Sequence, residues 1–168
     1  MVFTKIFPSQ HNNLKKDVPQ SSPVILQAEK NAETVFKLNR SLTEYHNDET
    51  NFCGTLKDVL RDGFGERPLY ESWLAEIEGF PLALATFFVN YSNFKGKACQ
   101  HLADLYAMDA RGLKLGKKLI SQVKLGANEL NCYRLELEVY QHNPARVFYE
   151  NSVLVILRIV STSPPVKN

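Results

Sequence analysis

Apolar side chains recur at two different spacings along this chain of 168 residues. From Ala32 to His46 they return every three or four residues, which predicts an amphipathic helix with one buried face. From Tyr133 to Tyr140 they return every second residue, which predicts a strand with one face in a core. The chain therefore combines helices with sheet strands.

Shorter apolar runs bounded by turn residues complete the predicted order of elements, β-α-α-β-β-β-α-β-α-β. The predicted strands are Pro23–Leu26, Tyr70–Glu78, Leu82–Tyr91, Gln100–Met108, Tyr133–Tyr140 and Val153–Val160. The predicted helices are Ala32–His46, Thr55–Leu60, a helix that carries Leu119 to Leu130, and Asn143–Glu150. This order predicts an α/β (α+β) fold with a mixed, mostly antiparallel central sheet flanked by helices.

Length and composition fit a single domain at residues 23–160, after a flexible leader at 1–22 and before a polar tail at 161–168. A net charge of +2 argues against a nucleic-acid partner. Three cysteines without CxxC spacing indicate reduced thiols and no metal site. No apolar run approaches the roughly 20 residues of a membrane helix, so we expect a cytoplasmic protein without a membrane partner.

Candidate binding chemistry lies where the strand that ends at Met108 meets the next helix. The six residues from Arg111 to Gly116 contain two glycines and two cations. The first N–H groups of a helix carry partial positive charge, and glycine lets an oxygen approach the backbone closely. The pattern predicts a phosphate cradle, and a polar helix start without a ligand is the alternative.

Three stretches in sequence order resemble the GNAT superfamily of N-acetyltransferases, and within it the spermidine/spermine (diamine) N-acetyltransferase group. They are LKDVLRDGFGERPLY at Leu56–Tyr70, the segment Asn90–Met108 with the Arg-Gly turn that follows it, and NPARVFY at Asn143–Tyr149. The resemblance covers about residues 24–150. It implies a sheet splayed between the fourth and fifth strands, a homodimer and acetyl-CoA as cosubstrate, without a metal.

The resemblance also implies how acetyl-CoA is held. The pantetheine arm is expected to bond the backbone of the fourth strand, and the pyrophosphate is expected to lie on the glycine turn. Lys114 stands where the group has a glycine, and the segment between Met108 and Arg111 is one residue shorter. The expected cofactor-binding residues are Leu105, Tyr106, Ala107, Arg111, Gly112, Leu113, Lys114, Leu115, Gly116, Lys117 and Asn143.

By the same resemblance Tyr149 is the expected general acid, which gives its proton to the departing thiolate. The proton-accepting glutamate of the group is replaced by Ala103, so Asp104 is expected to serve as the base through water. Neighbouring strand residues face opposite sides, so Asp104 is not a simple substitute for a side chain at 103. His101 shares the face of Ala103 and is either a second candidate base or a structural side chain.

The expected amine-binding residues are Tyr45, His46, Asp48 and Glu49. Carboxylates beside aromatic rings suit ammonium groups, although a solvated acidic turn has the same sequence. The expected function is acetyl-CoA-dependent N-acetylation of a polyamine or a similar small primary amine. The alternatives are a catalytically impaired acyl-CoA-binding protein and an acetyltransferase for a lysine-like or peptide amine. The resemblance fails after Tyr149, where a final strand is expected to be missing.

Overall fold

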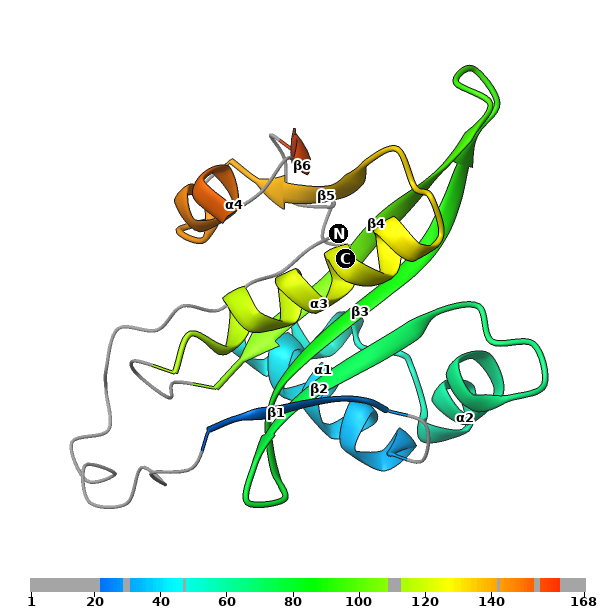
Figure 1. The fold of residues 1–168 in the computed structure, drawn as a ribbon. Helices are drawn as coiled ribbons and strands as arrows, with labels where there is room; N and C mark the ends of the chain where they lie inside the picture. The colour runs from blue at the N-terminus through cyan, green and yellow to red at the C-terminus, as the bar shows by residue number, and fades with distance from the viewer. Residues whose placement is uncertain are drawn as a thin grey trace.

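A six-stranded sheet in the order β1-β2-β3-β4-β5-β6 organises the computed structural model (Figure 1). The strands are β1 Val24–Gln27, β2 Glu71–Ile77, β3 Phe80–Ser92, β4 Lys97–Ala107, β5 Leu135–Tyr140 and β6 Val155–Val160. Neighbours from β1 to β4 are antiparallel, whereas β4–β5 and β5–β6 are parallel. The predicted α/β class and the mixed, mostly antiparallel sheet are therefore confirmed.

The structure describes residues 22–28, 31–46, 48–108, 113–141, 143–152 and 155–160. The expected leader up to residue 21, the expected tail at 161–168, and Arg111 and Gly112 of the glycine turn lie outside this range. None of the described helices is both long and apolar enough to cross a membrane.

Helices cover both faces of the sheet (Figure 1). They are α1 Ala32–Tyr45, α2 Leu56–Phe64, α3 Leu115–Glu129 and α4 Arg146–Ser152, with a short 3-10 turn, η1, at Glu49–Asn51. The buried face of α3 packs on a core that includes Leu102, Leu105 and the leucines of β5. On the other face, α1 packs on the row formed by Leu74, Leu84 and Tyr106. The apolar residues that recur at helical spacing in α1 and α3, and at every second position in β5, are therefore the ones that lie in the two cores.

Local chemistry sets the bounds of α2. The Thr55 hydroxyl accepts the N–H of Asp58 at 3.2 Å, and the Asp58 carboxylate accepts the N–H of Thr55 at 3.0 Å, which closes a capping box at the helix start. The helix runs four residues past its predicted end at Leu60, to Phe64, and so includes Gly63. A Cβ at Gly63 would lie 2.7 Å from the Tyr70 hydroxyl, so glycine lets this ring lie against the helix.

A hairpin joins β2 and β3, and its turn lies earlier than residues 79–81, the gap between the predicted strands Tyr70–Glu78 and Leu82–Tyr91. Glu78 and Gly79 adopt φ values of 52° and 80°, and Phe80 already belongs to β3. Two left-handed residues match the twist of a tight hairpin, which explains the shift.

The predicted splay between the fourth and fifth strands is present. Parallel pairing joins Gln100 to Leu135 and His101 to Glu136, and within the described residues these are the pairs between the two strands. Beyond His101, β4 and β5 diverge (Figure 1). The β4 edge that faces β5 is therefore left without a strand partner from Leu102 to Ala107.

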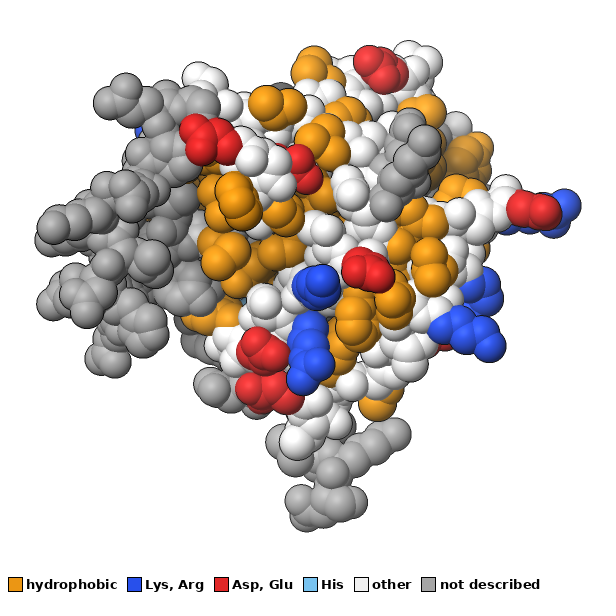
Figure 2. Space-filling model, turned by 90° about the horizontal axis from the view of Figure 1, so that it is seen from below, with side chains coloured by type: hydrophobic (Ala, Val, Ile, Leu, Met, Phe, Trp, Pro, Cys, Tyr) orange, Lys and Arg blue, Asp and Glu red, His pale blue; other side chains and the backbone are white. Residues whose placement is uncertain are grey.

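Charges on the surface are balanced locally. Acidic and basic side chains are interspersed with apolar ones over the face shown in Figure 2. Several pairs lie one helical turn apart, such as Arg40 with Glu44 at 3.3 Å and Arg146 with Glu150 at 2.7 Å. Exposed pairs of this kind contribute little to stability, so the sheet and its two cores carry the fold.

Lys114, the residue before α3, adopts the left-handed conformation with φ 52° and ψ 36°. That conformation costs a residue with a Cβ about 1–2 kcal/mol, whereas glycine gives back about 0.5–1 kcal/mol through its freer unfolded chain. We predict that Lys114→Gly raises the free energy of unfolding by about 0.5–1 kcal/mol in urea titrations. Lys118→Gly, at an exposed position inside α3, is the control and should lower it by about 1 kcal/mol. A Lys114→Gly variant less stable than the parent would contradict the prediction.

Candidate active site

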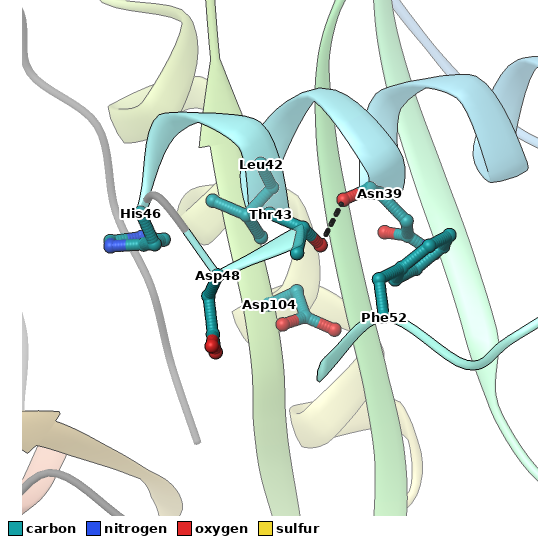
Figure 3. A pocket seen from close by; sticks show the side chains of 7 residues that line it. All are labelled: Asn39, Leu42, Thr43, His46, Asp48, Phe52 and Asp104. Atoms are coloured by element: carbon teal, nitrogen blue, oxygen red, sulfur yellow. Dashed lines mark hydrogen bonds between the residues drawn. The ribbon is translucent and has the colours of Figure 1, made fainter. Parts of the chain in front are cut away.

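A small pocket lies between the end of α1 and β4 (Figure 3). Its volume is about 220 Å³, below the roughly 300–1,000 Å³ of sites for drug-sized ligands, so it fits one end of a slender molecule. The lining residues are Asn39, Leu42, Thr43, His46, Asp48, Phe52 and Asp104.

The lining of this pocket is acidic. Asp48 and Asp104 supply two carboxylates, and these seven lining residues include no lysine or arginine. Thr43 donates its hydroxyl to the Asn39 carbonyl at 3.0 Å, as Figure 3 shows, and Phe52 adds an aromatic ring. Carboxylates next to an aromatic ring favour a cationic ligand such as an alkylammonium.

The four expected amine-binding residues are divided by the structure. His46 and Asp48 line the pocket, whereas Tyr45 and Glu49 are not among its lining residues. The Tyr45 ring packs edge-on against His46 with centroids 4.9 Å apart, and Glu49 is exposed in η1. Tyr45 therefore contacts His46 but does not line the pocket itself.

Asp104 has an unusual pKa, which burial raises to about 6. A carboxyl group with this pKa is still largely ionised at pH 7 to 8, yet it binds a proton far more readily than an exposed aspartate. This is the range in which a carboxylate is effective as a proton acceptor.

A β-bulge places Asp104 in the pocket. In the pairing of β3 with β4, Thr86 lies opposite Asp104 and Phe87 lies opposite Leu102, so Ala103 is an extra residue. Leu102 and Leu105 both belong to the core under α3, although strict alternation would put them on opposite faces. Ala103 and Asp104 consequently both turn to the α1 face. The expectation that they face opposite sides is wrong, because alternation does not hold across a bulge.

Asp104 continues a polar row across three strands. It pairs in register with Thr86, which pairs with Ser72. The Ser72 and Thr86 hydroxyl oxygens lie 3.2 Å apart, and each residue is only 6% exposed. This row lies next to the apolar row beneath α1, so the floor of the sheet changes from apolar to polar at the pocket.

Tyr149 is buried in the core on the other side of the splay, with 1% of its surface exposed. Its hydroxyl has no hydrogen-bond partner in the described part of the chain. The pKa of this hydroxyl lies well above its usual range, first because the ring is buried and then because the Asp104 carboxylate is near. The charge of the expected base therefore acts on the hydroxyl of the expected acid, although Tyr149 belongs to the core under α3 and Asp104 lines the pocket beside α1.

The start of α3 lies beside β4 and α4. A Cβ at Gly116 would lie 3.8 Å from the Leu105 side chain and 3.6 Å from the Phe148 ring. Leu115 is buried and Leu113 packs against the same core, whereas Lys114 and Lys117 are exposed. Lys118 donates the first intrahelical bond, to the Lys114 carbonyl at 3.1 Å, so the N–H groups of residues 115–117 precede the helical ladder.

Asn143, an expected cofactor residue, has a structural contact of its own. Its side-chain oxygen accepts the N–H of Ala145 at 2.9 Å, and the residue is only 7% exposed. This contact shapes the turn through Pro144, and α4 begins at Arg146, three residues later than expected.

A family model matches residues 33–152 of this chain, that of the acetyltransferase (GNAT) family. This chain belongs to the acetyltransferase (GNAT) family. The match runs from α1 through α4 and includes the pocket, the bulge and the start of α3.

Two curated relatives bear on the subgroup within the GNAT family. A thialysine N-epsilon-acetyltransferase of Bos taurus is 30% identical over 118 residues, which are 65% of this chain and 69% of that protein. A spermidine/spermine N(1)-acetyltransferase-like protein 1 of Homo sapiens is 28% identical over 106 residues, 58% of this chain and 15% of that protein. The chain thus spans only a small part of the length of the second relative.

Solved structures share the GNAT fold. An aminoglycoside acetyltransferase from an uncultured soil metagenomic sample has a TM-score of 0.71 at 15% identity, over 86% of this chain and 97% of that one. A ribosomal-protein-alanine N-acetyltransferase of Brucella melitensis has a TM-score of 0.63 at 20% identity, over 88% and 99%. At such identities the likeness concerns the fold alone.

GNAT proteins use acetyl-CoA as cosubstrate, and two features of the described residues would suit this ligand. The β4 edge at Leu105–Ala107 has free backbone groups toward β5, suited to an extended pantetheine arm. The start of α3 adds N–H groups and the cations of Lys114 and Lys117 for phosphates. Within the described ranges, no three His, Cys, Asp or Glu side chains are grouped as metal ligands.

Sequence reasoning missed several pocket residues. Asn39 and Thr43 recur at helical spacing with the expected His46 on the polar side of α1, a pattern that could have marked them as one face. Phe52 lies in the loop after η1 and carries no such pattern. The bulge at Ala103 likewise has no signature in the sequence, since neither glycine nor proline marks it.

The raised pKa of Asp104 predicts a stability cost. The carboxyl group binds a proton more tightly in the folded protein than at its ordinary value of 3.8, so stability falls as pH rises from about 4 through about 6. We predict that Asp104→Asn raises the free energy of unfolding by about 1–3 kcal/mol at pH 7.5 and leaves it unchanged at pH 4. Glu49→Gln, at an exposed carboxylate, should change it at neither pH. Urea titrations at both pH values would show this, and equal stability of Asp104→Asn and parent at pH 7.5 would contradict it.

Proposed function

We propose that this protein transfers the acetyl group of acetyl-CoA directly to a primary amine of a small polycation such as spermidine. The observation that carries the proposal is the pocket whose lining includes Asp48 and Asp104 and no cationic lysine or arginine. It lies on the α1 face of β4, to which the bulge turns Asp104.

Asp104 is proposed to accept the proton of the incoming ammonium group. An alkylammonium has a pKa of about 10, so its nitrogen must lose a proton before it can attack a carbonyl carbon. Burial raises the pKa of Asp104 to about 6. The carboxylate is therefore still charged at neutral pH, and it accepts a proton more readily than an exposed aspartate does. Asp48 is proposed to bind a second ammonium by charge.

Tyr149 is proposed to donate its proton to the departing sulfur. Acetyl-CoA supplies the acetyl group as a thioester, whose cleavage leaves a thiolate that must be protonated. Because the pKa of Tyr149 lies well above 10, its hydroxyl keeps its proton throughout the neutral range. The second proton that the nitrogen loses as the amide forms restores the Tyr149 hydroxyl, and the transfer needs no covalent intermediate on the protein.

The charge of the pocket favours a polyamine over a lysine-like acceptor. An amino acid brings a carboxylate of its own, and this lining offers two carboxylates and no lysine or arginine to meet it. The names of the curated relatives include both kinds of acceptor, thialysine and spermidine/spermine, so the two are the direct competitors.

The rate of thiol release from acetyl-CoA, measured with different amines, tests which amine is the acceptor. We predict turnover that depends on added amine, with kcat/KM for spermidine about tenfold or more above that for a lysine-like amine, since one unfavourable charge contact of about 1.4 kcal/mol gives this factor. A preference for the lysine-like amine would exclude the polyamine proposal and retain the reaction. Binding of acetyl-CoA in calorimetry without thiol release for any amine would favour the non-catalytic alternative.

Tyr149→Phe separates catalysis from folding. We predict that kcat falls by about 10²-fold or more, the usual contribution of a positioned acid. The free energy of unfolding should stay within about 0.5 kcal/mol of the parent or rise, because the removed hydroxyl has no partner among the described residues. Tyr91→Phe, at an exposed tyrosine, is the control for loss of a hydroxyl. Full activity in Tyr149→Phe would remove this residue from the mechanism.

A further inference from the structure

A second polar cluster lies on the α1 face of the sheet, centred on Glu136 of β5. Arg134 donates to Glu136 Oε2 at 2.6 Å, and Asn90 of β3 donates to Oε1 at 3.3 Å. The Cys99 thiol of β4 lies 3.7 Å from Oε1, and His101 Nδ1 lies 3.6 Å from the same oxygen. Three strands therefore converge on one carboxylate.

The position of this cluster connects it to the active site. His101 and Glu136 form the last pair between β4 and β5 before the two strands diverge, so they lie at the vertex of the splay. His101 alternates with Leu102, which faces α3, and therefore shares the α1 face with Ala103 and Asp104. Along β4, the side chain between His101 and Asp104 on that face is the methyl group of Ala103.

The His101 ring is held in place from two sides. Its centroid lies 4.8 Å from that of Phe88, the residue opposite it on β3, and Nδ1 faces the Glu136 carboxylate. With Nδ1 on the side of Glu136, Nε2 lies on the far side of the ring. The side chain is 15% exposed, so the ring is in contact with solvent.

Glu136 does not need His101 as a charge partner. Arg134 already neutralises this carboxylate, and Asn90 satisfies its other oxygen. The groups around His101 that titrate or carry charge are Glu136 of β5, Arg134 just before that strand and Cys99 from its own strand, while β3 contributes the uncharged Phe88 and Asn90. An imidazole that is fixed in position next to a carboxylate whose charge is already balanced can accept a proton and release it again.

We propose that His101, positioned by Glu136, passes the proton that Asp104 takes from the amine to solvent at the vertex of the splay. This inference rests on the proposed function. The ammonium proton moves to the Asp104 carboxylate, then through water to the His101 imidazole, and the imidazolium releases it to bulk water. Asp104 is thereby returned to its charged form before the next turnover.

The test is steady-state acetylation of spermidine by the full chain and three variants. His101→Gln should lower kcat about tenfold or more and change KM for spermidine less than about threefold, because the amine contacts remain. Added imidazoles should restore its kcat in order of their basicity, an effect that a merely structural side chain does not give. Glu136→Gln should lower kcat about threefold to tenfold.

Glu129→Gln is the matched control, since it makes the same change as Glu136→Gln at an exposed position of α3; its kcat should stay within about twofold of the parent. A His101→Gln variant with parental kcat, a Glu129→Gln loss of equal size, or the lack of rescue by imidazoles would each overturn the role of His101 and leave the acetyltransferase proposal intact. No thiol release by the unaltered protein would overturn both. If His101→Gln does not fold, Glu136→Gln decides, and parental kcat in that variant would overturn the inference.

Discussion

Two pairs of residues, Gln100 with Leu135 and His101 with Glu136, join the antiparallel half of the sheet to its parallel half. The other neighbouring strands pair over more residues. The position at which the pairing of β4 with β5 stops determines where an extended ligand can enter. Backbone groups of β4 that would otherwise bond β5 are released from Leu102 onward. The start of α3 and the buried Tyr149 lie on this opening, so the candidate chemistry depends on the early end of one ladder.

The bulge at Ala103 is the second constraint. One extra residue in β4 turns Asp104 to the face that α1 leaves partly open, in line with Thr86 and Ser72. If Leu102, Ala103 and Asp104 alternated regularly, without a bulge, Asp104 would lie under α3 in an apolar core, where its charge would be far more costly. The same shift leaves Ala103 and His101 on the face of Asp104. A single irregularity in register thus assembles the polar groups of the pocket and those of the vertex on one side.

Much of the fold could be predicted from the sequence, because periodic burial leaves a clear pattern. The α1 helix, the alternation of β5 and the capping box at Thr55 and Asp58 follow from neighbours in the sequence. The end of α2 and the turn at Glu78 and Gly79 were misplaced because they depend on contacts with residues far along the chain or on backbone twist. The resemblance to a family indicated the splay, which residue patterns alone do not contain. The facing of Asp104 was predicted incorrectly, since alternation assumes an unbroken register.

Lys114 adopts a left-handed backbone conformation that glycine would adopt without strain, and it carries a positive charge that glycine lacks. The turn before α3 is thus formed by a residue with a side chain, and that side chain brings a cation to the helix start where phosphates are proposed to bind. The same position costs backbone strain and supplies positive charge. A glycine there would relax the turn and remove a charge from the proposed phosphate site at the same time, so stability and ligand charge are opposed at this one residue.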